Sequence, residues 1–289
     1  MPGPLLLHPP TTLEYFASLV EDDSSLPLLE TAIAVAQDEF ADLDTQTVLA
    51  EIDTLAARLK ARMPADAVAI QRLRWLNRFF FQELGFTGNV NDYYHPHNSY
   101  IHLVLQTRRG IPITLALIYI ELATQLGLVA SGVSFPGHFL VKLRMPQGEV
   151  VIDPFTGQSL SREALASLLI PYRLSRELPE SGEVPLTLFL QSAAGREIIA
   201  RMLRNLKEIH RGAEDGSRLL AVMQRLVILL PEAWEERRDR GLAYARLGVA
   251  GAALDDLATY LEHMPEAADR DAIVERVAEL GQGRAPHLH

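Results

Sequence analysis

The 289-residue sequence contains no cysteine. Disulfide bonds, thiolate metal sites and catalysis by a thiol are therefore excluded for this chain. No apolar run approaches the roughly 18 to 20 residues of a membrane-spanning helix. The early leucines, Leu5 to Leu7, lack the basic leader of a secretory signal. We therefore expect a cytoplasmic protein with no membrane partner.

Positive charge is also scarce. Lys and Arg number 27 against 37 Asp and Glu, for a formal net charge of -10. Binding to a phosphate backbone depends mainly on Lys and Arg, so we expect no nucleic-acid partner. Hydrophobic residues make up 48% of the chain, which is ample for one large core or for two to three smaller ones.

The stretch 108–155 has the most informative pattern. Pro112 suits the first turn of a helix, and apolar residues recur at helical spacing from there until Gly127 supplies a stop. Alternating residues then predict two strands, 139–144 and 150–153, on either side of a turn at 145–148. His138 would open the first strand and Asp153 would end the second, so we expect their side chains to lie close together.

Helical patterns flank this stretch. Capping residues and apolar stripes predict helices through most of residues 1–84, the last of them from about Asp66 to Leu84. Residues 85–98 form a loop rich in glycine, asparagine and aromatics, a composition that often borders a site. We expect Tyr93 and Tyr94 to join the phenylalanines at 79–81 in a core cluster.

The C-terminal third is helical and repetitive. Pro231 and Pro265 are 34 residues apart, which is the period of a tetratricopeptide repeat. The small residues Gly241 and Ala253 would let two helices approach closely. The preceding copy is degenerate, because Lys207 occupies the place of the helix-crossing glycine.

Several of these motifs resemble the transglutaminase-like superfamily. They are Gly110-x-Pro112-x-Thr114-Leu115-Ala116, Leu126-Gly127-Leu128, His138 at a strand start, and Asp153-Pro154. More narrowly, the sequence is similar to SirB-type bacterial proteins, which carry a helical N-terminal region and C-terminal tetratricopeptide repeats. The motifs of this second resemblance are Tyr93-Tyr94-x-Pro96-x-Asn98-Ser99-Tyr100, Arg109 to Thr114, and Phe135 to Leu140.

The resemblance implies an α+β fold. We expect a helical N-terminal cap over 1–90, and a transglutaminase-like (papain-like) core with a small antiparallel sheet over 91–178. Tetratricopeptide-like helical repeats would cover 188–283. In the superfamily the thiol nucleophile would fall on Pro112, the base on His138 and the orienting acid on Asp153, so the nucleophile is missing here.

The first functional hypothesis is therefore non-catalytic. We expect Asp153 to hold the His138 ring by a charge-assisted hydrogen bond that braces the two strands. The chain would act as a regulator or adaptor that binds a protein or peptide through the core groove and the repeat surface. The expected binding residues of the groove are Asn98, Arg109, Gly110, Thr114, Gly137 and His138.

Two alternatives stay open. A hydrolase or amide-modifying enzyme could use His138 and Asp153 with water or with an oxygen nucleophile. Ser134 and Ser99 are possible by sequence but lack a nucleophile signature, whereas helical geometry turns the Thr114 side chain about 200° away from Pro112. The chain could instead be a structural subunit of a larger assembly.

Three histidines invite a metal-binding hypothesis. His95, His97 and His102 are close in sequence, but Pro96 separates the first two and no acidic residue apart from Asp92 completes a known spacing. We expect solvated loop histidines, no metal and no cofactor. The sequence does not indicate an oligomeric state.

Overall fold

The computed structural model describes residues 10–176 and 185–282. These fall in two compact units. The core unit comprises the described part of residues 22–202, and the repeat unit joins the described parts of 1–21 and 203–289. Helix α10 (Gly195–Gly212) contributes its first residues to the core unit and the rest to the repeat unit. The finer division of the chain at residues 90 and 178 stays a prediction.

The core unit begins with the predicted helices. They are α2 (Leu28–Ala34), α3 (Thr45–Lys60) and α4 (Ala69–Asn77). The next residues, Arg78–Glu83, form a π-helix, so the single helix predicted up to Leu84 is in fact two segments. The wider turn lets the successive residues Phe79 and Phe80 both lie in the interior, at 1% and 0% exposure.

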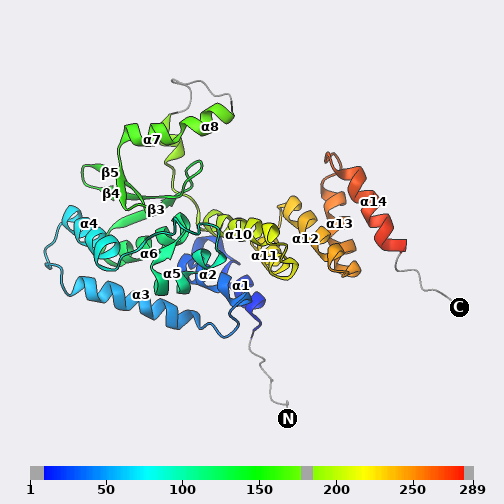
Figure 1. Cartoon of the computed structure of the whole chain (residues 1–289), viewed down its shortest axis with the longest axis horizontal. Helices are drawn as coiled ribbons and strands as arrows, with labels where there is room; N and C mark the ends of the chain where they lie inside the picture. Colours follow the sequence, from blue (N-terminus) through cyan, green and yellow to red (C-terminus); the bar gives the residue numbers. More distant parts are fainter. Residues whose placement is uncertain (1–9, 177–184, 283–289) are drawn as a thin grey trace, which may run out of the picture. The chain divides into compact units, whose positions relative to one another are not determined.

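Helix α6 (Pro112–Gln125) is the centre of this unit, as predicted. Pro112 occupies its first turn, and nine of its residues are buried. Gly127 follows with φ +73°, and the Leu128 N–H donates to the Ala123 carbonyl at 2.9 Å, which closes the helix end. Helix α6 contacts α3 and the strands β3 and β4, so its apolar residues pack on both sides (Figure 1).

A four-stranded antiparallel sheet lies beside α6. Its strands occur in chain order, β3 (Val129–Val133), β4 (Leu140–Met145), β5 (Gly148–Asp153) and β6 (Gln158–Leu160). The predicted turn is confirmed, with Met145 opposite Gly148 and Val141 opposite Ile152. The alternating residues of β4 place Leu143 in the core and Arg144 in solvent.

Shorter elements complete the core unit. A two-stranded parallel pair joins residues separated by α5, and three short helices follow the sheet. Their bounds are β1 (Thr87–Gly88), α5 (Ile101–Thr107), β2 (Arg109–Gly110), α7 (Arg162–Leu168), α8 (Ile170–Ser175) and α9 (Leu186–Phe189).

The repeat unit is entirely helical over its described residues. It contains the repeat-unit part of α10 together with α1 (Thr12–Leu19), α11 (Gly216–Leu229), α12 (Trp234–Arg246), α13 (Ala250–His263) and α14 (Arg270–Gln282). The predicted close approach is confirmed, since a Cβ added at Gly241 would lie 2.9 Å from the Leu257 side chain. Helix α1 contributes Phe16, whose buried ring lies 5.3 Å from the guanidinium carbon of Arg225 on α11. No helix within the described ranges is long and apolar enough to cross a bilayer.

Candidate functional site

His138 lies in a turn and not on a strand. Its N–H donates to the Phe135 carbonyl at 2.9 Å, and β4 begins two residues later, at Leu140. Gly137 supplies the left-handed backbone of this turn, with φ +72°. The half-buried His138 ring lies 6.5 Å from the ring of Phe135, so the turn presents the imidazole beside an aromatic core residue.

The Asp153 carboxylate accepts hydrogen bonds from residues of its own turn. One oxygen accepts from the Phe155 N–H at 2.9 Å and the other from the Thr156 hydroxyl at 2.9 Å. Nowhere in residues 10–176 and 185–282 does a hydrogen bond join Asp153 to His138. The expected brace is therefore not formed, because a local turn and not the imidazole satisfies the carboxylate.

The first position of α6 carries no nucleophilic side chain. Pro112 stands at the first position of α6, as the resemblance implies. The Thr114 hydroxyl is fully buried, and it lies within hydrogen-bond distance of two carbonyl oxygens, those of Asn98 at 2.8 Å and Ile111 at 3.0 Å. Ile111 directly precedes α6, whereas Asn98 belongs to the turn before α5. Thr114 therefore anchors the helix start.

Three of the six predicted binding residues, Asn98, Gly110 and Thr114, lie together in one buried cluster. Asn98 is 4% exposed, and its amide group donates to the carbonyls of Asp92 and Tyr93 at 2.7 and 3.1 Å. Gly110 leaves the room that Thr114 needs, since a Cβ there would lie 2.8 Å from the Thr114 hydroxyl. Asn98, Gly110 and Thr114 thus position the loop around the helix start, and direct ligand contact by them stays a prediction.

The other three predicted binding residues lie nearer the surface. Arg109 is exposed and donates to the Gly85 carbonyl at 2.9 Å, beside the β1–β2 pair. Gly137 and His138 share the turn before β4. The predicted set therefore comprises the buried cluster, Arg109 next to Gly110 on β2, and the turn that carries Gly137 and His138.

An aromatic surface adjoins this region. Tyr93 lies 5.2 Å from Tyr94 and 5.9 Å from Phe155, measured between ring centres. Phe155 itself lies against Gly88, where a Cβ would overlap its ring. Tyr93 is 42% exposed and Tyr94 is 77% exposed, so the predicted core cluster with the phenylalanines at 79–81 is wrong for both tyrosines.

Arg201, on α10, completes the surface, and the sequence did not indicate it. Its Nη1 donates to the Ser134 hydroxyl at 2.8 Å, and its guanidinium carbon lies 5.5 Å from the centre of the Phe139 ring. Ser134 and Phe139 bracket the turn that carries His138. We call Tyr93, Tyr94, His138, Phe155 and Arg201 the core surface.

His95 and His97 lie in the loop, but His102 is buried on α5, so the expectation of solvated loop histidines is wrong for His102. His102 lies 4.7 Å from Phe40 and is 8% exposed, and His95 lies 4.4 Å from His97 between ring centres. Burial lowers the pKa of His102, and the neighbouring His97 lowers it further. In the part of the chain that the structure describes, no group of three or more His, Cys, Asp or Glu side chains could hold a metal ion.

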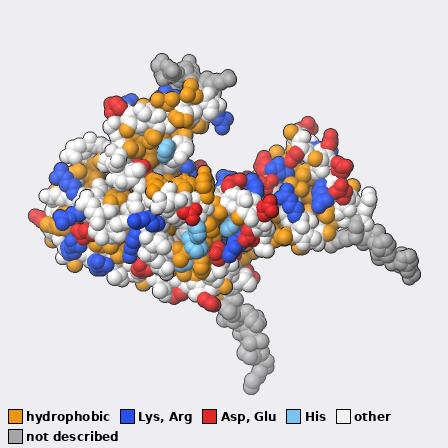
Figure 2. All heavy atoms as spheres, in the orientation of Figure 1, with side chains coloured by type: hydrophobic (Ala, Val, Ile, Leu, Met, Phe, Trp, Pro, Cys, Tyr) orange, Lys and Arg blue, Asp and Glu red, His pale blue; other side chains and the backbone are white. Residues whose placement is uncertain are grey.

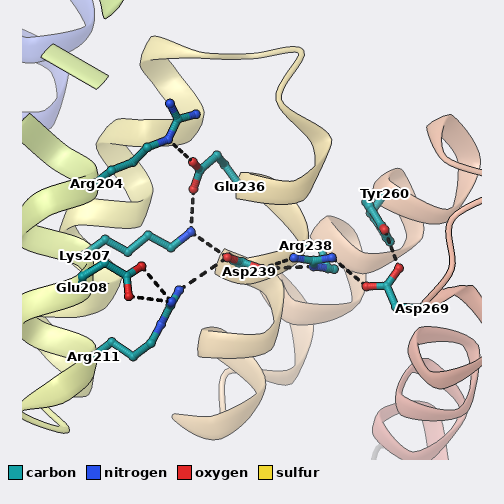
Figure 3. A network of polar contacts seen from close by, with 9 residues as sticks. All are labelled: Arg204, Lys207, Glu208, Arg211, Glu236, Arg238, Asp239, Tyr260 and Asp269. Carbon is teal, nitrogen blue, oxygen red and sulfur yellow. Dashed lines mark hydrogen bonds and ion pairs between the residues drawn. The ribbon is translucent and has the colours of Figure 1, made fainter. Parts of the chain in front are cut away.

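The repeat unit contains an extended ion-pair network (Figure 3). Lys207, the residue that made the first repeat look degenerate, is 5% exposed and donates to Glu236 and Asp239, each at 2.6 Å. Arg204 also pairs with Glu236, at 2.8 Å, and Arg238 links Asp239 to Asp269. Lys207 therefore joins α10 to α12 by charge, where a standard repeat would use close backbone contact.

A cavity of about 400 Å³ opens in the same unit. Leu219, Ala243 and Leu247 supply its apolar lining, and Arg211 and Arg246 line it as well. Leu247 is 44% exposed.

The surfaces of the two units differ in composition. Over α12 and α13, Figure 2 shows basic and acidic side chains interleaved, whereas hydrophobic side chains gather over α7 and α8 in the core unit.

Comparison with known proteins identifies the family. Residues 46–204, more than half of the chain, match the model of the transglutaminase-like superfamily. The chain belongs to the transglutaminase-like superfamily. Residues 206–278 of this transglutaminase-like protein match the tetratricopeptide repeat.

Bacterial relatives cover nearly the whole length. A UPF0162 protein of Xylella fastidiosa is 38% identical over 91% of this chain and 93% of the relative. A UPF0162 protein of Pseudomonas aeruginosa is 30% identical over 91% and 94%. Protein SirB1 of Salmonella typhimurium is 28% identical over 84% and 88%. No solved structure matches the chain. The α+β fold and the SirB-type resemblance are thereby confirmed.

Proposed function

We propose that this transglutaminase-like protein is a non-catalytic regulator or adaptor that binds a protein or peptide partner. One observation carries the proposal: within the described residues, the superfamily's nucleophile is absent and no hydrogen bond joins the residues at its base and acid positions. Pro112 has no reactive group, and Asp153 bonds to its own turn and not to His138. Triad chemistry needs a nucleophile, a base and a group that orients the base.

The alternative enzyme has little support. An oxygen nucleophile in place of the thiol would need an accessible hydroxyl near His138. Thr114 is fully buried among backbone acceptors, Ser99 is fully buried as well, and Ser134 accepts a hydrogen bond from Arg201. The hydroxyls of Thr114 and Ser134 are thus engaged in hydrogen bonds, and that of Ser99 is closed off from solvent.

Two surfaces suit a protein partner. The core surface exposes Tyr93 and Tyr94, and aromatic side chains of this kind are enriched in protein interfaces. The repeat unit offers the cavity beside Leu247, and helical repeats generally form extended binding surfaces. A net charge of -10 disfavours nucleic acid as the partner, and we propose the cytoplasm as the location.

Site-specific photo-crosslinking tests the proposal in the bacterial cell. A benzophenone amino acid replaces Tyr94 on the core surface, or Leu247 beside the repeat cavity, in the full-length chain. Matched controls place it at Val129 and at Val274, which are 63% and 41% exposed in the same two units. We expect one adduct of defined mass from positions 94 and 247, in which mass spectrometry identifies the same partner.

The controls should give no such adduct. An equal adduct from the control positions, or none from positions 94 and 247, would count against an adaptor. Hydrolysis of an amide or ester by the purified chain, abolished by His138→Ala, would replace the proposal with the enzymatic alternative.

A further inference from the structure

The basic residues of α10 form ion pairs with acidic side chains, with one exception. Arg196 pairs with Asp23, Arg204 with Glu236, and Lys207 with both Glu236 and Asp239. Arg211 pairs with Glu208 and Asp239. Arg201 is the one cation of this helix for which residues 10–176 and 185–282 supply no carboxylate partner.

Arg201 is nevertheless held in place. The Ser134 hydroxyl accepts from Nη1 at 2.8 Å, and the Phe139 ring lies under the guanidinium at 5.5 Å. A guanidinium has five N–H donors in a fixed planar arrangement. Within residues 10–176 and 185–282 no hydrogen bond engages Nε or Nη2, and neither atom is among the fully buried polar atoms that lack a partner. The side chain is thus oriented but has most of its donors free.

The environment favours an anion at this position. Burial lowers the pKa of Arg201, and the nearby Tyr93 partly offsets that effect. Burial likewise raises the pKa of Tyr93, while the charge of Arg201 lowers it. Both pKa shifts indicate that the Arg201 charge is partly removed from water and lies near the Tyr93 phenol, and the described residues place no carboxylate beside it. A carboxylate would supply the missing charge and accept two parallel hydrogen bonds.

We propose that Arg201 binds the carboxylate of an acidic side chain in a partner peptide, with Tyr93 and Phe155 receiving the neighbouring apolar residue. This inference rests on the proposed binding function and names the chemistry of the partner. Tyr94, at 77% exposure and 5.2 Å from Tyr93 between ring centres, extends the exposed aromatic surface beyond Tyr93. An internal acidic residue fits such an open surface.

The overall charge makes the inference sharply testable. At -10, the chain as a whole repels acidic peptides, so any preference for them must come from a local site. The probes are three short peptides of common sequence, each with a leucine beside the variable position. The first carries glutamate and an amidated C-terminus, the second carries glutamine and an amidated C-terminus, and the third carries glutamine and a free C-terminal carboxylate.

Binding is followed in the full-length protein by ¹H–¹⁵N NMR of the arginine Nε–H groups. We expect the glutamate peptide to shift the Arg201 signal and to bind about tenfold more tightly than the amidated glutamine peptide, as a charge-assisted pair would give. Arg201→Gln should abolish that preference. Arg144→Gln removes an equal charge from the exposed face of β4 in the same unit and should leave the preference intact.

Other outcomes overturn the inference. Equal binding of the two amidated peptides, or an unchanged preference in Arg201→Gln, would show that Arg201 does not select a carboxylate. Tighter binding of the free C-terminus would assign the site to chain ends instead. If Arg201→Gln does not fold, Ser134→Ala takes its place, and it should weaken the preference by releasing the guanidinium. Crosslinking from position 94 would still test the adaptor function separately.

Discussion

Replacing Lys207 with methionine should destabilise the repeat unit strongly. The Lys207 side chain is 6% exposed, and its ammonium lies 2.6 Å from carboxylate oxygens of both Glu236 and Asp239. Removing one partner of a buried ion pair typically costs about 3 to 5 kcal/mol, because a charge is left uncompensated. Arg204 and Arg238 still contact the two carboxylates, so we expect the lower end, about 3 kcal/mol.

Urea unfolding measures this free energy without adding salt that would screen the pairs. The chain has two tryptophans, and Trp234 starts α12 beside the network. In a Trp75→Phe background, its fluorescence reports the repeat unit alone. The matched control is Arg204→Met, whose side chain is 52% exposed and should cost less than about 1 kcal/mol. A loss below about 1 kcal/mol for Lys207→Met, or equal losses for both variants, would refute the reasoning.

The same network predicts a pH dependence. Burial alone would raise the pKa of Glu236, but hydrogen bonds from Lys207 and Arg204 outweigh it, so the pKa lies below its ordinary 4.5. A carboxyl group whose pKa is lower in the folded than in the unfolded state stabilises the fold at pH values above its unfolded-state pKa. That stabilisation is lost as the pH falls through the folded-state pKa. Repeat-unit stability should therefore fall below about pH 4.5. Lys207→Met should flatten this dependence, and an unchanged slope would contradict the assignment.

Three further substitutions test the packing and the turn. Gly88→Ala should cost about 1 to 3 kcal/mol in urea unfolding, because its Cβ would overlap the Phe155 ring, and an unchanged midpoint would contradict that packing. Gly137→Ala meets no atom within 4 Å but keeps φ +72°, so about 1 to 2 kcal/mol of backbone strain is expected. Asp153→Ala should destabilise the core unit by about 1 to 3 kcal/mol through its turn while leaving the NMR shifts of the His138 ring unchanged. A large shift of that ring would mean that the two side chains are coupled after all.

Local sequence patterns were enough to predict several regular elements of the fold. The start of α6 at Pro112, the turn at 145–148 and the contact of Gly241 with Leu257 all follow from backbone geometry or spacing that one segment encodes by itself. The π-helix after α4 escaped prediction, because its energy depends on burying Phe79 and Phe80 together.

The candidate site was harder to predict than the fold. Asp153 could bond to His138 or to its own turn, and only the three-dimensional path of the chain decides between them. Arg201 lies 67 residues from Ser134 along the chain, so no spacing rule connects them. The unpaired charge could have been suspected only by comparing the basic residues of α10 one by one against possible acidic partners.

Installing the missing thiol tests the central claim most directly. Pro112→Cys creates the only cysteine of the chain, and the rate of its alkylation by iodoacetamide against pH gives the thiol pKa. A helix N-terminus can lower that pKa by itself, so the decisive comparison is with Pro112→Cys combined with His138→Ala. The account predicts the same thiol pKa in both variants. A pKa that is lower in Pro112→Cys and returns toward about 8.5 when His138 is removed would show that a catalytic arrangement survives.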